Sequence, residues 1–259
     1  MLVQVISRHR PEWVPVFTGL TVRQFDKLVR VVAARGGQQT GTGRRWGLSL
    51  ADRVLLVAVY YRTNLTYRQV ALLFGISKSA AGRVVDHLAP LLALAPIKRA
   101  PGPETVLIVD GTLVPTHDRS MSASSKNYRY SVNMQIAIDA NTRLTVAVGR
   151  PTPGNRHDCR AYRDSGVDRQ CHGATVIADG GYQGNFEVIM PYRIPADGSP
   201  LPCWKHDLNT VHKRVRARVE HALAHMKTWN VLRNCRRKRD GVWYATRGVA
   251  QMRNLAMTY

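Results

Sequence analysis

Apolar and polar positions change their spacing near residue 100. Before it, apolar residues recur three and four positions apart, as at Phe25, Leu28, Val29 and Val32, which predicts amphipathic helices. Three such segments begin with a hydroxyl residue followed three positions later by Gln or Asp, as in a capping box. These pairs are Thr21/Gln24, Ser49/Asp52 and Thr66/Gln69. Residues 1–98 are therefore predicted to form a helical domain, with Gly36–Gly47 as an internal linker.

Two of the predicted helices are separated by a short turn. The first covers Tyr67–Phe74, the chain turns at Gly75, and the second begins after Ser77 and runs toward Leu88. This is the layout of a helix-turn-helix, in which the second helix enters the major groove of DNA by its N-terminal end. The residues expected to face DNA are Lys78, Ser79 and Arg83.

Beyond a boundary at Pro96–Pro103, apolar residues form continuous or alternating runs that predict β-strands. Three runs, at 105–111, 131–140 and 143–149, are expected to form an antiparallel meander, and 174–182 a later strand. Short helices are predicted at His157–Ser165 and Tyr244–Leu255. This order of elements predicts an α/β fold with a mixed sheet for residues 99–259.

A further helix is predicted at Lys213–Lys227, with Asn209 or Thr210 as its cap. At about 100° per residue its apolar residues share one side. A different face carries Lys213, Arg216, Glu220 and Lys227, so one carboxylate lies among three cations. Taken alone, this helix is better explained as having a solvated, salt-bridged face than as part of a binding site. The choice between the two depends on residues elsewhere in the chain.

The charge of the chain indicates a polyanionic partner. It has 38 Lys and Arg against 17 Asp and Glu, a net charge of +21, and the excess lies in residues 1–100 and 201–259. Such an excess favours nucleic acid over a membrane surface. The N-terminal residues do not resemble a secretory signal, no segment is apolar over the roughly 20 residues that span a bilayer, and the four cysteines form no Cys-x-x-Cys pair. We therefore expect a cytoplasmic, nucleoid-associated protein.

Two aspartates each follow a predicted buried strand, Asp110 and Asp179. If the strands are neighbours, both acids reach one edge of the sheet, where Glu220 of the later helix could join them. Carboxylate oxygens suit Mg²⁺ or Mn²⁺, and two such ions about 3.5–4 Å apart promote phosphodiester displacement. Each aspartate taken singly could instead cap a turn. Asp158 could add a carboxylate, although a helix N-terminus explains it more simply.

These residues resemble the DDE transposases of the IS5-like group. The resemblance is carried by VDGT at 109–112, ADGGY at 178–182 and the R-x3-E-x6-K spacing of Arg216, Glu220 and Lys227. NMQIAID at 133–139 and PGNRHD at 153–158 resemble the linking blocks of the same endonuclease superfamily, and the predicted helix-turn-helix resembles the one that precedes it. One position departs from the related signature, which has Tyr where Lys213 stands here.

The resemblance implies an RNase H-like catalytic domain with Asp110, Asp179 and Glu220 as its metal-binding triad. Arg216 and Lys227 would contact DNA phosphates, and we place Lys213 beside them as a DNA contact. The expected protein is an insertion-sequence transposase that binds terminal inverted repeats of double-stranded DNA, as a homo-oligomer, and cleaves and joins strands with Mg²⁺ or Mn²⁺. Two alternatives remain at this point, a helix-turn-helix regulator without catalytic activity and a serine or tyrosine recombinase.

Overall fold

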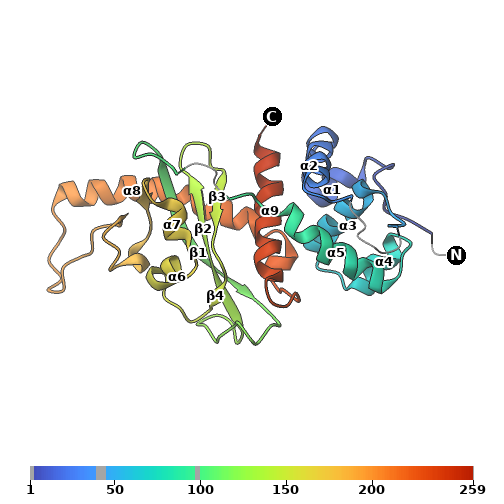
Figure 1. The fold of residues 1–259 in the computed structure, drawn as a ribbon. Helices are drawn as coiled ribbons and strands as arrows, with labels where there is room; N and C mark the ends of the chain where they lie inside the picture. Colours follow the sequence, from blue (N-terminus) through green and yellow to red (C-terminus); the bar gives the residue numbers. More distant parts are fainter. Residues whose placement is uncertain (1–2, 39–44, 97–99, 259) are drawn as a thin grey trace. The chain divides into compact units, whose positions relative to one another are not determined.

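The structure is a computed structural model that describes residues 3–38, 45–96 and 100–258 (Figure 1). The chain divides into two compact units: one joins the segment ending at Leu94 to the segment from Met226 onward, and the other is Ala95–His225. Parts of the predicted linker and of the predicted boundary, residues 39–44 and 97–99, lie outside the described residues. The C-terminal segment thus packs with the N-terminal helices. The division of function at residue 98, with DNA binding before it and catalysis after it, remains a prediction.

The first unit is helical and is built around one fully buried helix. That helix, α3 (Leu50–Thr63), is buried at every position from Asp52 to Tyr61. Because both sides of α3 are covered, its sequence from Val54 to Tyr61 carries no charge on any side, as expected of a helix in a core. Its neighbours are α1 (Trp13–Thr18), α2 (Val22–Ala34), α4 (Tyr67–Leu73), α5 (Lys78–Leu92) and a 3₁₀ turn at Asn230–Leu232, and α9 (Gly241–Met257) packs on α5 and α2.

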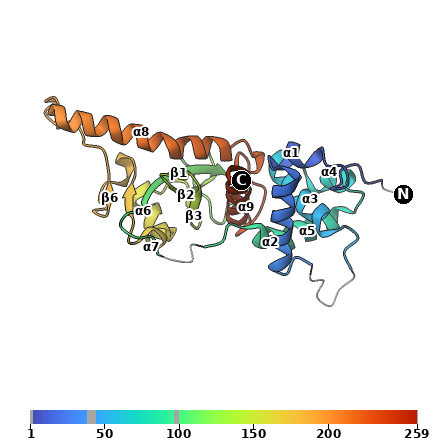
Figure 2. The same cartoon turned by 90° about the horizontal axis from the view of Figure 1, so that it is seen from above.

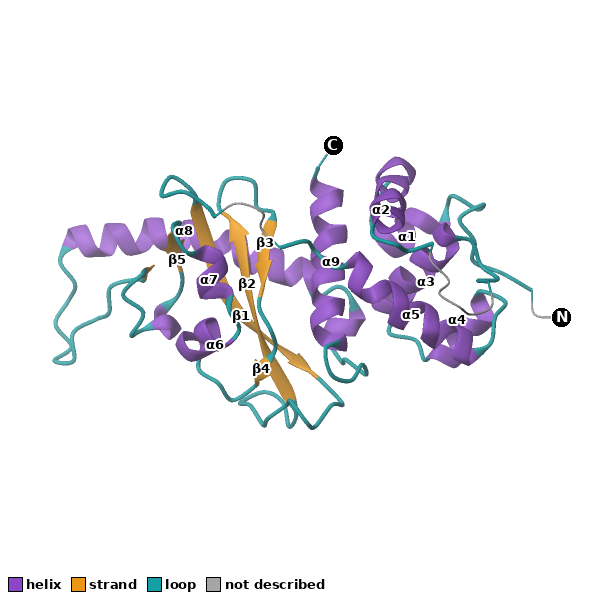
Figure 3. Ribbon diagram, in the orientation of Figure 1, coloured by secondary structure: helices purple, strands orange, loops and turns teal. Residues whose placement is uncertain are grey.

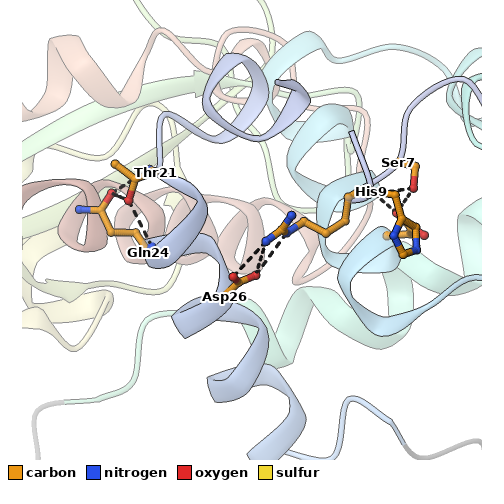
Figure 4. Close-up of polar contacts among 7 residues, drawn as sticks. Ser7, His9, Thr21, Gln24 and Asp26 are labelled. Atoms are coloured by element: carbon orange, nitrogen blue, oxygen red, sulfur yellow. Dashed lines mark hydrogen bonds and ion pairs between the residues drawn. The ribbon is translucent and has the colours of Figure 1, made fainter. Parts of the chain in front are cut away.

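The predicted helix starts are confirmed at all three hydroxyl residues. Thr21 and Thr66 form reciprocal capping boxes with Gln24 and Gln69, and Figure 4 shows the first of them beside the carboxylate of Asp26, which pairs with Arg8. Ser49 accepts the backbone N–H of residue 52, and its hydroxyl, rather than its backbone N–H, donates to Asp52 Oδ2 at 3.0 Å. The other carboxylate oxygen of Asp52 accepts hydrogen bonds from the Ser7 hydroxyl and the backbone N–H of residue 8. It thereby ties the N-terminal segment to α3.

The helices α4 and α5 confirm the predicted helix-turn-helix. Gly75 occupies the left-handed region between them (φ +65°), which a residue with a side chain rarely adopts. Ser77 caps α5 by accepting the backbone N–H of residue 80, and Ala81, Val84 and Leu88 are buried. The helix therefore presents its other side to solvent.

The second unit contains a mixed sheet in the order β3-β2-β1-β5-β6 (Figure 3). Antiparallel strands β1 (Val106–Pro115), β2 (Ser131–Asp139) and β3 (Thr145–Val148) are followed by β5 (Thr175–Ile177), which runs parallel to β1, and β6 (Val188–Ile189), parallel to β5. A short β4 (Thr152–Pro153) pairs with β2. These are the strand order and directions of the RNase H-like fold, so the predicted mixed α/β sheet is confirmed.

Helices cover both faces of this sheet. Figure 2 shows α6 (Asp158–Asp164) and α7 (Val167–Cys171) on one face and the long α8 (Cys203–Met226) along the other. Among the described residues, no helix combines the length and the apolar character needed to cross a membrane.

Helix α8 begins ten residues before the predicted Lys213, and neither expected cap is used. Residues between Pro202 and Lys213 include no Gly or Pro, so nothing interrupts the helix once it has started after Pro202. The Asn209 side chain instead bonds both backbone groups of Tyr192, and the Thr210 hydroxyl donates to a carbonyl one turn earlier. Asn209 thus fastens the preceding loop to α8.

Candidate active site

Asp110 lies near the middle of β1, opposite Ile136 of β2, and its side chain is only 15% exposed. The backbone N–H of Gly111 donates to Asp110 Oδ1 at 2.9 Å, and Arg216 Nη2 donates to Oδ2 at 3.2 Å. The pKa of Asp110 is raised to about 6, first by burial and then by the charges of Asp179 and Asp158, against the lowering effect of Arg216 and of the Gly111 hydrogen bond. Asp110 is therefore a desolvated carboxyl group with other acids close by.

Arg216 joins Asp110 to Glu220. The same Nη2 atom lies 3.2 Å from Asp110 Oδ2 and 3.2 Å from Glu220 Oε1, so the two carboxylate oxygens are separated by at most twice that distance. Arg216 is 17% exposed and Glu220 56% exposed. Among the described residues, no hydrogen-bond partner is found for the buried Nε of Arg216. Two acids more than a hundred residues apart thus meet at one guanidinium group.

Asp179 follows β5 by two residues and begins a 3₁₀ turn, Gly180–Tyr182. Its Oδ1 accepts the backbone N–H of Gly181 at 2.8 Å, which fixes the carboxylate at the strand end. Its charge contributes to the raised pKa of Asp110. Since β5 lies beside β1, the two aspartates lie on neighbouring strands, which was the condition set from the sequence. The predicted place of Asp110 at a strand end is wrong, because β1 continues to Pro115 in pairing with β2.

Asp158, at the start of α6, is a further acid of this region, and sequence reasoning gave it only a secondary place. Its Oδ1 accepts hydrogen bonds from the amide nitrogens of Asn133 at 2.8 Å and Gln135 at 2.9 Å. It lies against Gly111, where any side chain would collide with it. The Asp158 carboxylate therefore needs the glycine that follows Asp110. In the sequence, the signs of this contact were the glycine that follows Asp110 and an acid at the start of a predicted helix.

A buried polar chain supports Asp158. The Tyr182 hydroxyl donates to Gln135 Oε1, and the Gln135 amide nitrogen donates to Asn133 Oδ1 as well as to Asp158. Burial raises the pKa of Tyr182 well above its usual range, and the nearby carboxylates act in the same direction. The neutral phenol is thus a hydrogen-bond donor, which fixes the orientation of the Gln135 amide.

The donors of this region suit a divalent cation. Among the described residues, no three His, Cys, Asp or Glu side chains already have the separations of a metal site. In this structure the Arg216 guanidinium supplies the positive charge between Asp110 and Glu220. Carboxylate oxygens are the hard ligands that Mg²⁺ and Mn²⁺ prefer, and a desolvated acid with two acidic neighbours is stabilised by an added cation. The residues present therefore fit the metal that the sequence predicted.

The remaining predicted contacts with DNA lie at three places. Lys78, Ser79 and Arg83 are exposed at the start of α5, and Lys213 is exposed on α8. Lys227 follows the last residue of α8 and belongs to the helical unit, where its carbonyl accepts a hydrogen bond from Arg233. Only Arg216 is brought directly to the acids.

An RNase H-like sheet with acids on neighbouring strands, in a chain that also has a helix-turn-helix, defines a class of protein, the DNA-processing nucleases and transposases. Residues 101–255 match the family model "Transposase DDE domain", and residues 46–96 match "Helix-turn-helix of DDE superfamily endonuclease". The chain belongs to the DDE transposase family. It is an insertion-sequence transposase, and catalysis in this family depends on divalent metal.

Two relatives agree with this assignment. The chain is 55% identical, over 98% of each chain, to a putative transposase for insertion sequence element IS112 of Streptomyces albus G. It is 29% identical, over 86% of each chain, to a probable transposase for insertion sequence element IS702 of Microchaete diplosiphon. Among solved structures, a cryo-EM structure of the piggyBac transposase synaptic complex with hairpin DNA aligns with a TM-score of 0.47 and 10% identity, covering 96% of this chain and 74% of that one.

Proposed function

We propose that Asp110, Asp179 and Glu220 hold two Mg²⁺ or Mn²⁺ ions and that this transposase uses them to cut DNA at the ends of its element and to join the freed ends to target DNA. The observation that carries the proposal is the shared contact of Arg216 Nη2 with Asp110 and Glu220. It is supported by the neighbouring charge of Asp179, which raises the pKa of Asp110.

When bound, the metal activates the attacking oxygen and stabilises the leaving oxygen of the phosphodiester. The chain supplies fixed positions for the acids. The N–H groups of Gly111 and Gly181 orient Asp110 and Asp179, and α8 brings in Glu220. Arg216, whose Nη2 contacts both carboxylates, holds Asp110 and Glu220 together. No covalent link between enzyme and DNA is required.

The DNA is bound by different residues. We infer that Lys78, Ser79 and Arg83 contact the terminal inverted repeats through the major groove, because they are exposed at the start of α5. Lys213, Arg216 and Lys227 would contact phosphates near the cut. The functional division is the one predicted from the sequence, with end binding in residues 1–98 and catalysis in residues 99–259. Two copies of the chain, one on each end, would form the active homo-oligomer.

Single substitutions that remove one charge each test the proposal. Asp110→Asn, Asp179→Asn and Glu220→Gln are each expected to reduce strand cleavage by on the order of a thousandfold or more, because each weakens the binding of the catalytic metal. Binding of the ends is expected to stay within about twofold of wild type, since the DNA-binding residues are untouched. The measurements are nicking of a labelled end duplex in Mg²⁺ and a binding titration in Ca²⁺.

The matched control is Asp164→Asn, which also removes one acid from this unit. Asp164 is exposed and pairs with Arg156 and Arg160 on the surface, so cleavage should remain close to wild type. A triad variant that cuts as well as this control would exclude that residue from the site. Absence of Mg²⁺-dependent nicking by the wild-type protein itself, with no effect of the three changes, would favour a DNA-binding regulator.

A further inference from the structure

The helical unit contains a cavity of about 440 Å³ beside the helix-turn-helix. Its apolar wall consists of Tyr60, Leu65 and the ring of Tyr67, whose centroid lies 5.0 Å from that of Tyr60. Its cationic side chains are Arg68 of α4, Lys78 of α5 and Arg236 of the C-terminal segment. Three separate parts of the chain thus each contribute one positive charge, and the lining residues include no carboxylate.

Arg236 is held at this cavity by Asn64, which ends α3. Asn64 has a left-handed backbone (φ +53°), and its side-chain nitrogen donates to the carbonyl of Asn234 at 2.7 Å. Its side-chain oxygen accepts a hydrogen bond from Arg236 Nε at 3.4 Å. Buried Cys235 anchors the same segment. The hydrogen bond at Nε orients the guanidinium and leaves its two terminal nitrogens for a ligand.

The next residue, Arg237, pairs with an acid of α5 and with a residue of the cavity wall. Its Nη1 lies 2.7 Å from Asp86 Oδ1 and 2.6 Å from the Tyr67 hydroxyl. The arginine is 10% exposed and Asp86 is 70% exposed. Arg237 therefore neutralises the acid of α5 and fixes the ring of Tyr67 in the cavity wall. Arg237 supports the cavity, while Arg236 faces it.

We propose that this cavity binds one backbone phosphate of duplex DNA with its deoxyribose, and that the C-terminal segment thereby takes part in DNA binding by the helix-turn-helix. The proposal rests on the proposed function, since it places the phosphate on the duplex held by α5. The three cations match a phosphate, and the apolar wall matches a sugar rather than a base edge. A cavity of this size falls within the range of small-ligand sites. The first helix of such a motif crosses the DNA backbone, which places a phosphate near Arg68.

The contact is expected to be independent of sequence, because a phosphate carries no base information. Arg236→Gln should therefore weaken binding to an end duplex and to an unrelated duplex by the same factor, roughly tenfold at low salt. The slope of log affinity against log salt should fall by about one unit. Arg30→Gln, at an exposed arginine of α2 outside the cavity, is the matched control. It should change the affinity and the salt slope less than Arg236→Gln does.

A scan with single methylphosphonates locates the phosphate. Each probe is an end duplex in which one backbone phosphate has been made neutral. We expect one position to cost wild type and Arg30→Gln roughly tenfold, and to cost Arg236→Gln clearly less, because one of the three cations that contact the phosphate is already lost. Arg68→Gln should show a reduced cost at the same position and provides a second variant should Arg236→Gln disturb the fold.

Two results would overturn the proposal. One is an Arg236→Gln variant that binds both duplexes like Arg30→Gln. The other is a loss confined to the end sequence, which would indicate a base contact. A wild-type protein that does not distinguish the end duplex from the unrelated one would instead contradict end recognition, and the salt slope on the unrelated duplex would still decide whether the cavity binds a phosphate.

Discussion

The two compact units use positive charge in opposite ways. In the helical unit, Lys78 and Arg83 are exposed at the start of α5, where water solvates them. In the sheet unit, Arg216 is 17% exposed and bonded to two carboxylates. An exposed charge gains little from any one partner, whereas a buried pair that loses one member leaves the other uncompensated. We therefore expect single changes of exposed cations such as Lys78 and Arg83 to have small and additive effects on DNA binding, and changes at the acids to have large effects on cleavage.

Of the substitutions that test this comparison, Arg216→Lys should have the largest effect. A lysine has one ammonium group and cannot contact both carboxylates while also presenting a second nitrogen to a phosphate. We expect strand cleavage to fall on the order of a hundredfold, with end binding within about twofold. The measurement is the single-turnover nicking rate at saturating protein. Arg214→Lys, an exposed position two residues earlier on α8, should cut like wild type. Equal rates for the two variants would show that Arg216 has no special role.

Asp158 tests whether the buried polar chain behaves as a unit. Asp158→Ala removes one of the acceptors of each of the Asn133 and Gln135 amides, so the free energy of unfolding should fall by about 1–3 kcal/mol. Asp158→Asn keeps an oxygen that can accept both bonds, and we expect it to cost less than about 1 kcal/mol. Urea denaturation followed by circular dichroism measures both. Equal losses for the two variants would mean that the carboxylate charge, and not the hydrogen bonding, stabilises this region.

Lys78→Gln should give the smallest effect. Removing one exposed cation is expected to weaken end binding only a few-fold at moderate salt and to lower the salt slope by about one unit. Cleavage at saturating protein should be unchanged, because no catalytic group is altered. Fluorescence anisotropy over a salt series measures the slope. A lost cleavage rate at saturation would contradict the separation of binding from chemistry.

The helical unit could be predicted from local sequence because its signals are local. Thr21, Ser49 and Thr66 cap the helices that follow, and Gly75 makes the turn between α4 and α5. One local error, the start of α8, arose because Asn209 looks like a cap but bonds the backbone of Tyr192, seventeen residues away. A capping residue with a tertiary partner cannot be told from a true cap by its neighbours in the sequence.

The acids were predicted by a different route. Asp110, Asp179 and Glu220 were chosen for their strand ends, their helix face and a family resemblance, and the contact of Arg216 with two of them required the fold. The Asp158 contacts depend on the register that places Gln135 opposite Gly111, which no pattern within either strand specifies. The packing of residues 226–259 with the N-terminal helices is likewise a long-range property. Assignment of these residues to the metal remains a prediction.

The most direct test of the central claim is a calorimetric titration in which Mn²⁺ is added to the protein bound to an uncut end duplex. For wild type and Asp164→Asn, we expect two ions to bind, and for Asp110→Asn, Asp179→Asn and Glu220→Gln an affinity lower by at least about tenfold. This readout does not depend on cleavage. If all three variants bind Mn²⁺ with wild-type affinity and stoichiometry, these carboxylates do not form the metal site, and the proposed mechanism is wrong.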